Sequence, residues 1–209
     1  MKKFITTLLI LSGFYSVSFA QTKGAVDFGA NVGLNSSSVE SSQSGQSSDY
    51  TSGFNVGAYL EYYFSDRWSI KGKVSYDQKG WGNGYLVDNS GNEVDGIDFH
   101  LNYITIPITA NWHFGRARNW YINFGPYVGV LLNANESSNS GLPVKDAFNT
   151  TDVGLDLGIG VKIPITNKVK LFFEYDGQGG ATSLFKQSEG DNVQSIRSSF
   201  NAGLAFSLN

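Results

Sequence analysis

The chain of 209 residues has no cysteine, four prolines and two histidines. Without cysteine it cannot be one of the small exported domains that disulfides hold together. With two histidines it has few candidates for a base that titrates near neutral pH. No segment after residue 20 approaches the roughly 18 consecutive apolar residues of a membrane helix. These absences exclude a disulfide scaffold and a bundle of membrane helices.

Charged residues are also sparse, at 16%, and 15 lysines and arginines stand against 18 acidic residues. A nucleic-acid binder normally carries a clustered basic surface, so no nucleic-acid partner is predicted. The abundant residues are glycine, with 25 copies, and the aromatics, at 14%. Together with many serines and asparagines, this composition is typical of a β-rich protein with many turns.

The N-terminal segment has the layout of a secretory signal peptide. Lys2 and Lys3 precede a mostly apolar run, and Ser18 and Ala20 place small residues before Gln21. We therefore predict a signal peptide at 1–20, cleaved after Ala20, and one domain at 21–209. An uncleaved anchor helix is the alternative. The mature domain would have 189 of the 209 residues, enough for a substantial core.

A two-residue alternation of apolar and polar side chains runs through eight later segments, which is the period of a β-strand. The predicted strands are 24–35, 51–64, 68–79, 99–114, 119–132, 151–163, 168–178 and 196–208. Short turns at 65–67, 115–118 and 164–167 alternate with long polar stretches at 36–50, 80–98, 133–150 and 179–195. An even strand number with short turns on one side and long loops on the other is typical of an outer-membrane barrel. The predicted fold is all-β, an eight-stranded antiparallel transmembrane up-and-down β-barrel with both termini periplasmic.

The polar face of these strands carries charges, whereas the apolar face carries none between its ends. The predicted lumen charge network comprises Glu61, Lys71, Lys73, Asp156, Lys162, Lys170, Glu174 and Arg197. A charge on the lipid face near the midplane would cost ~2–4 kcal/mol, so we expect the apolar face to meet lipid and the charged face to meet the lumen. Eight strands enclose an interior that side chains can fill, so a paired plug is favoured over a transport path.

Aromatic residues gather at both ends of the segments, as expected where rings lie at the headgroup zone. The predicted interfacial aromatics near the short turns are Phe64, Trp68, Trp112, Trp120 and Phe206, and a second belt toward the long loops includes Tyr76, Phe99, Tyr175 and Phe200. The alternative is that these rings cap a soluble core. Pro107 and Pro126 lie inside predicted strands, where each would remove a ladder hydrogen bond or mark a bulge.

Two strand motifs resemble those of a known family. Tyr103-Ile104-Thr105-Ile106-Pro107 is similar to a Tyr-x-x-Ile-Pro strand, and Gly125-Pro126-Tyr127-Val128-Gly129 to a Gly-Pro-Tyr-x-Gly strand, of the PorT-like outer-membrane β-barrel family. The end of the chain, 203–208, looks like the closing strand of that family. The resemblance covers about 24–209. It implies a small eight-stranded barrel with no catalytic residues, inserted among outer-membrane lipid with the help of the barrel-assembly machinery.

Chemistry is not predicted from these residues. His100 and His113 are the two candidate bases, and no nucleophile and orienting carboxylate accompany either in sequence. The loop 80–98 contains an oxygen-rich run that could hold Ca²⁺. A hairpin is the favoured interpretation, with 85–87 and 93–94 as its arms. Neither a metal nor a cofactor is expected. The serine-rich loop 36–50 is predicted to be mobile.

Three functions remain open at this point. The first is a non-catalytic structural or interaction scaffold that acts through four external loops. The second is an accessory of transport or secretion, whose unknown partner would meet a basic rim at Arg67, Arg116 and Arg118. The third is a soluble periplasmic barrel that holds a small ligand, which would need its apolar residues inside.

Overall fold

The structure is a computed structural model that describes residues 23–41, 48–87, 93–137, 144–186 and 192–208. The predicted signal peptide, 1–20, lies outside the described residues. No helix in the described part of the chain is long and apolar enough to cross a membrane.

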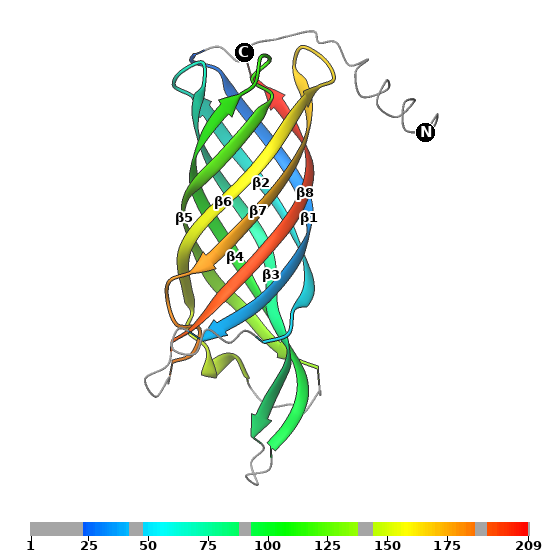
Figure 1. The fold of residues 1–209 in the computed structure, drawn as a ribbon, viewed down its shortest axis with the longest axis vertical. Helices are drawn as coiled ribbons and strands as arrows, with labels where there is room; N and C mark the ends of the chain where they lie inside the picture. The colour runs from blue at the N-terminus through cyan, green and yellow to red at the C-terminus, as the bar shows by residue number, and fades with distance from the viewer. Residues whose placement is uncertain (1–22, 42–47, 88–92, 138–143, 187–191, 209) are drawn as a thin grey trace, which may run out of the picture.

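Eight antiparallel strands close into a single barrel in sequence order, with β1 pairing β8 (Figure 1). The predicted fold class is therefore confirmed. The strands are β1 (Val26–Ser41), β2 (Thr51–Tyr63), β3 (Trp68–Val87), β4 (Glu93–Phe114), β5 (Trp120–Glu136), β6 (Thr151–Pro164), β7 (Val169–Gly180) and β8 (Val193–Ser207). A short 3₁₀ helix, η1 (Val144–Ala147), lies between β5 and β6.

The three short turns lie at the end of the barrel where the described chain begins and ends (Figure 1). Backbone hydrogen bonds tie both chain ends to this rim, from Gly24 N to Tyr63 O at 2.8 Å and from Leu208 N to Val26 O at 2.9 Å. The long connections lie at the opposite end. The alternation of connection lengths that the sequence predicts is thus present in the fold.

Several strands run further toward the long loops than the alternation predicts. β1 continues to Ser41, because the serine-rich run pairs with β8 from Ser36↔Ser198 to Ser41↔Val193. The prediction of a mobile loop at 36–50 is therefore wrong for 36–41, and 42–47 lies outside the described residues. The ladder with β8 satisfies backbone groups of this run on one side, and β2 pairs on the other side only as far as Ser37.

The predicted hairpin within 80–98 is confirmed. Tyr85↔Asp95, Leu86↔Val94 and Val87↔Glu93 pair as its two arms, and β3 and β4 extend together beyond the rest of the barrel (Figure 1). The tip, 88–92, where calcium was the alternative, lies outside the described residues.

The two prolines interrupt one ladder without shifting it. The β4–β5 pairing breaks off after Pro107↔Tyr127 and resumes at Ala110↔Phe124 in the same register. Pro126, which has no N–H, lies between these points. The side-chain alternation survives because the register does, so the prolines remove hydrogen bonds but create no bulge there.

The core of the molecule is the barrel lumen, where large rings sit beside glycines. A Cβ on Gly160 would lie 2.4 Å from Cζ of Tyr121, and one on Gly29 would lie 2.5 Å from Cε1 of Tyr59. The absence of a side chain at these positions makes room for the neighbouring ring, a large-and-small pattern that fills small barrels.

The outer wall is apolar along the length of the barrel. Exposed residues at its middle include Val32, Leu60, Leu155 and Leu157, each more than 60% accessible. In the part of the wall that carries these residues, no outward position has Asp, Glu, Lys or Arg; Asp95 and Asp98 of β4 lie further along, toward the long loops. This arrangement, apolar outside and charged inside, contradicts the soluble barrel, which needs the reverse.

Candidate functional site

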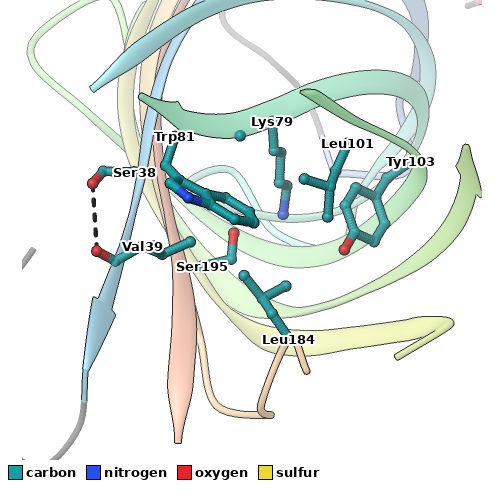
Figure 2. A pocket seen from close by; sticks show the side chains of 9 residues that line it. Ser38, Val39, Lys79, Trp81, Leu101, Tyr103, Leu184 and Ser195 are labelled. Atoms are coloured by element: carbon teal, nitrogen blue, oxygen red, sulfur yellow. Dashed lines mark hydrogen bonds between the residues drawn. The ribbon is translucent and has the colours of Figure 1, made fainter. Parts of the chain in front are cut away.

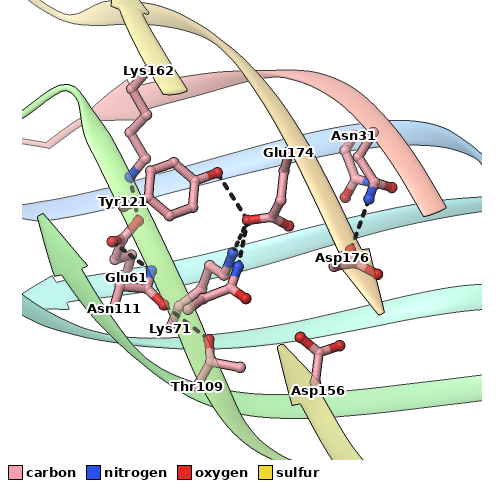
Figure 3. A network of polar contacts seen from close by, with 12 residues as sticks. Asn31, Glu61, Lys71, Thr109, Asn111, Tyr121, Asp156, Lys162, Glu174 and Asp176 are labelled. Carbon is pink, nitrogen blue, oxygen red and sulfur yellow. Dashed lines mark hydrogen bonds and ion pairs between the residues drawn. The ribbon is translucent and has the colours of Figure 1, made fainter. Parts of the chain in front are cut away.

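The lumen contains a network of buried charges arranged in several centres, of which Glu61 is the first (Figure 3). Its carboxylate accepts hydrogen bonds from Ser69 Oγ at 2.5 Å and Asn111 Nδ2 at 2.9 Å, and it pairs with Lys162 Nζ. His113 Nε2 lies 3.2 Å from the same carboxylate. Four strands thus converge on one fully buried group.

Asp27 forms a second centre, nearer the short turns. Its carboxylate is 2.8 Å from Lys170 Nζ and 3.5 Å from Lys162 Nζ, and it accepts hydrogen bonds from Tyr63 and Ser207. Lys162 therefore bridges Asp27 and Glu61. Asp27 was absent from the predicted network although it lies on the charged face.

Glu174 is the third centre, at mid-height. Lys71 Nζ is 2.5 Å from its carboxylate, and Tyr121 and Asn123 each donate to it at 2.8 Å (Figure 3). The ammonium of Lys71 also lies 5.3 Å from the centre of the Tyr121 ring, within the range of a cation–π contact. The carboxylate and the cation that the sequence predicted are here direct partners.

Arg197 joins two further carboxylates toward the long loops. Its guanidinium is 2.5 Å from Asp176 and 3.5 Å from Asp77. Asn201 donates to Asp176 and Asn35 donates to Asp77, each at 2.8 Å. Arg197 was a predicted member of the network, whereas Asp77 and Asp176 were not.

Lys79 and Asp152 make the last ion pair before the loop end, at 2.9 Å and with both side chains almost fully buried. Tyr127 donates to the same carboxylate at 3.1 Å, and its ring centre lies 4.5 Å from the lysine nitrogen. This pair too was missed.

The two remaining predicted members, Lys73 and Asp156, face inward and are buried, but neither has an ion pair among the described residues. Asp156 accepts a hydrogen bond from Gln178 at 2.9 Å. The structure therefore brings six of the eight predicted residues into ion pairs. It adds four carboxylates and one lysine: Asp27, Asp77, Asp152, Asp176 and Lys79. The prediction had five cations and three carboxylates. With the added residues the lumen has six cations and seven carboxylates, so the sign of its net charge changes from positive to negative.

An apolar cap lies above the network, at the long-loop end. Its buried members come from the strand ends and from the connections that follow β5 and β7: Val39, Trp81, Ile97, Phe99, Leu101, Tyr103, Leu131, Ala134, Val144, Phe148 and Leu184. Trp81 stacks on Phe99 with 4.6 Å between ring centres, and Phe148 pairs with Phe185 across a β-bridge. The assignment of Phe99 to the outer aromatic belt is therefore wrong, because its ring points inward.

A small cavity of about 10 Å³ separates the cap from the Lys79–Asp152 pair, and Figure 2 shows the side chains around it. Trp81, Leu101 and Leu184 form its apolar side, and Lys79, Tyr103 and Ser195 its polar side. This volume is about that of one water probe.

A family model described as outer membrane protein beta-barrel domain matches residues 19–186. The chain belongs to this family. It is similar to the outer membrane protein OprG from Pseudomonas aeruginosa at 10% identity and a TM-score of 0.54, covering 91% of this chain and 98% of that one. It is also similar to the outer membrane protein AlkL at 8% identity and a TM-score of 0.52, covering 94% and 96%. No curated protein matches the chain.

Membership in the outer membrane barrel family fixes the surroundings of the outer wall. The apolar band faces lipid of the outer membrane, so the lumen residues are inside a membrane-embedded wall. Phe64, Trp68, Trp112, Trp120 and Phe206 all lie on the outward face near the short turns. Trp68 and Trp112 are cross-strand partners in the β3–β4 ladder.

A histidine, a serine and a carboxylate meet in this barrel, a contact that the sequence did not predict. Ser69 Oγ lies 2.9 Å from His113 Nε2. In a catalytic triad the carboxylate binds the other ring nitrogen. Here Glu61 approaches Nε2 as well, and Nδ1 has no hydrogen-bond partner among the described residues. All three side chains are fully buried, so no substrate reaches them in this conformation.

The described residues contain no group of three or more His, Asp or Glu side chains arranged to hold a metal ion. The remaining candidate base, His100, is half-buried on the outward face of β4 near the long loops. It does not join the lumen network.

Proposed function

We propose that the protein is a non-catalytic scaffold of the outer membrane that acts through its external loops, with a lumen closed to solutes. The observation that carries this proposal is burial along the whole lumen. Side chains at every level, including Asp27, Glu61, Asp77 and Lys79, are at most 3% accessible. A water-filled channel would leave such wall residues open to solvent, as in wider barrels.

Conductance in planar lipid bilayers tests the closed lumen. The purified barrel is expected to give no stable openings, whereas a porin inserted into the same bilayers gives its usual steps. Stable openings of porin size from the wild-type barrel would contradict the proposal of a closed lumen.

The loop end offers the surface for recognition. The β3–β4 hairpin extends beyond the rest of the wall, and Tyr50 and Val94 are exposed there. A rigid barrel that carries variable loops is a common way to place a binding surface. The apolar cap, which packs the connections onto the strand ends, supports this use of the loops.

Site-specific photo-cross-linking in living cells tests the loop surface. A photoreactive residue at Tyr50 or Val94 is expected to capture a defined partner. Ile165, equally exposed but in the β6–β7 turn, is the matched control. Adducts only from Ile165 would instead support the second candidate, a transport or secretion accessory whose partner meets the short turns. That candidate is favoured by the exposed Arg67 and Arg116 of that rim.

We also propose that the chain belongs to the PorT-like group within the barrel family. The two motifs that carry this resemblance face each other, since Pro107 of β4 pairs with Tyr127 of β5.

Export with cleavage after Ala20 and insertion by the barrel-assembly machinery are further parts of the proposal. Mass spectrometry of the intact mature protein is expected to show a chain that begins at Gln21.

A further inference from the structure

A groove lies at the short-turn end of the barrel. It has a volume of about 490 Å³, within the ~300–1,000 Å³ of small-molecule sites. The β2–β3 and β4–β5 turns form it. A backbone hydrogen bond of 2.7 Å from His113 N, at the end of β4, to Arg67 O holds the β2–β3 turn against β4. The lining side chains used below are Lys23, Phe64, Asp66, Arg67, Trp68 and Arg118.

The groove has an excess of positive charge. Three cations, Lys23, Arg67 and Arg118, line it together with one carboxylate, Asp66, which gives a net charge of +2. Arg118 Nη1 is 3.3 Å from Asp66, so the carboxylate already has a cationic partner. An anion that entered the groove would meet the remaining positive charge.

The backbone at Arg118 is unusual. Its φ is +55°, in the left-handed region that residues other than glycine and asparagine rarely adopt. Glycine would fit this turn position without strain, yet an arginine stands there and its side chain lines the groove. Uncommon backbone of this kind gathers at binding sites.

The apolar side of the groove belongs to the lipid-facing wall. Phe64 and Trp68 line the groove and are 45% and 37% accessible on the outward face. The groove therefore opens between the cationic turns and the aromatic belt, where the headgroups of a bilayer lie. A ligand there would have its charge at the turns and its apolar part against the wall.

We propose that this groove binds the phosphodiester headgroup of an anionic phospholipid in the leaflet at the short-turn end. Guanidinium groups match phosphate oxygens in bidentate geometry, and Arg67 and Arg118 supply two. The aromatic wall favours a lipid over free phosphate, which has no apolar part. This site is on the opposite end from the loops and is independent of their function.

Native mass spectrometry of the detergent-solubilised barrel tests the site with phosphatidylglycerol, with phosphatidylcholine of the same acyl chains, and with inorganic phosphate. The wild type is expected to retain phosphatidylglycerol in preference to phosphatidylcholine. In the double variant Arg67→Gln/Arg118→Gln, retention of phosphatidylglycerol should fall by about 25-fold. Each cation near a membrane surface contributes roughly fivefold in affinity, and the variant removes two of them. Arg116→Gln removes an exposed arginine of the same turn that does not line the groove, and it should change retention less than twofold.

Asp66→Asn separates binding from folding, because it should increase phosphatidylglycerol retention by about fivefold, and a misfolded variant would not. Heat-modifiable gel mobility confirms that each variant is folded. Three outcomes would overturn the proposal: equal retention of the two lipids, a loss in Arg116→Gln as large as in the double variant, or displacement of the lipid by inorganic phosphate at equal concentration.

Discussion

At the scale of single residues, the lumen carboxylates differ in how fully their charge is compensated. Glu61 has an ammonium, a hydroxyl, an amide and a histidine around it, whereas Asp156 has one amide donor from Gln178. A buried ion pair adds little net stability, but removing one partner leaves a charge uncompensated. The stability of this barrel therefore depends more on keeping its pairs complete than on having many of them.

Glu61→Gln is expected to lower the free energy of unfolding by about 3 kcal/mol, because Lys162 keeps its hydrogen bond to Tyr63 but has only the more distant Asp27 as a charged partner. Urea titration of the barrel in lipid vesicles measures this change. Asp66→Asn, which breaks the exposed turn pair with Arg118, is the control and should cost about 0–1 kcal/mol. Equal costs for the two variants would contradict the view of Glu61 as a buried centre.

The sequence predicted which face these residues occupy but not their partners. Parity along a strand is a local property, and it placed all eight predicted charges in the lumen. Lys71 and Glu174, in contrast, are 103 positions apart, and only the closed registers of the intervening strands bring them together. Parity also places Asp27 and Asp152 on the inward face, but it does not show which inward carboxylate meets a cation.

At the scale of elements, the apolar cap and the charge network are two separate layers. The connection that contains η1 contributes Val144 and Phe148, and the one after β7 contributes Leu184 and Phe185. Phe148 contacts the rings of Trp81, Phe99 and Phe185. Since ring contacts hold the cap and ion pairs hold the layer below, the cap can loosen while the wall remains closed.

Phe148→Ala is therefore expected to open the cap without unfolding the barrel. The absence of native cysteine allows Ser195→Cys, at the cavity below the cap, to report on it. A bulky maleimide in detergent solution should label this cysteine at least tenfold faster when Phe148 is replaced, as cavity formation weakens the packing. Ser52→Cys, at an exposed position of β2, should react equally in both backgrounds.

The cap escaped prediction for a physical reason. Phe99, Leu101 and Tyr103 share the inward parity of the charged face, but the alternation there has aromatic and aliphatic side chains inside. Beyond the membrane no lipid requires an apolar outer face. The rule that apolar residues face outward and charged residues face inward therefore does not hold there. The connections after β5 and β7 have no periodicity that could have indicated a second core.

At the scale of the whole molecule, the outer wall of the barrel is as apolar as the core of a soluble protein, and the lumen is charged like the surface of one. The eight alternating segments were sufficient to predict the wall, its strand order and its short turns. The sequence alternation gave this result because lipid outside and a filled lumen inside impose opposite requirements on neighbouring residues. Strand lengths at the loop end were underestimated, since the ladder there continues beyond the lipid.

A charge placed on the outer wall should have a cost that depends on depth. Leu157→Arg, at the middle of β6, is expected to lower the free energy of unfolding of the barrel in vesicles by ~2–4 kcal/mol. Ile163→Arg, on the same face near the short turn, should cost ~0–1 kcal/mol. Urea titrations in the same vesicles measure both, and similar costs at the two depths would contradict the placement of the membrane around the barrel.

The seam between β1 and β8 makes the first and last strands of the chain neighbours. Asp27 of β1 pairs with Lys170 of β7, accepts a hydrogen bond from Ser207 of β8, and lies 3.5 Å from Lys162 of β6. A chain that stops short of β8 would leave one edge of β1 unpaired and would remove the hydroxyl donor that Ser207 supplies to Asp27. The seam therefore closes the backbone ladder and completes the polar surroundings of Asp27 at the same place.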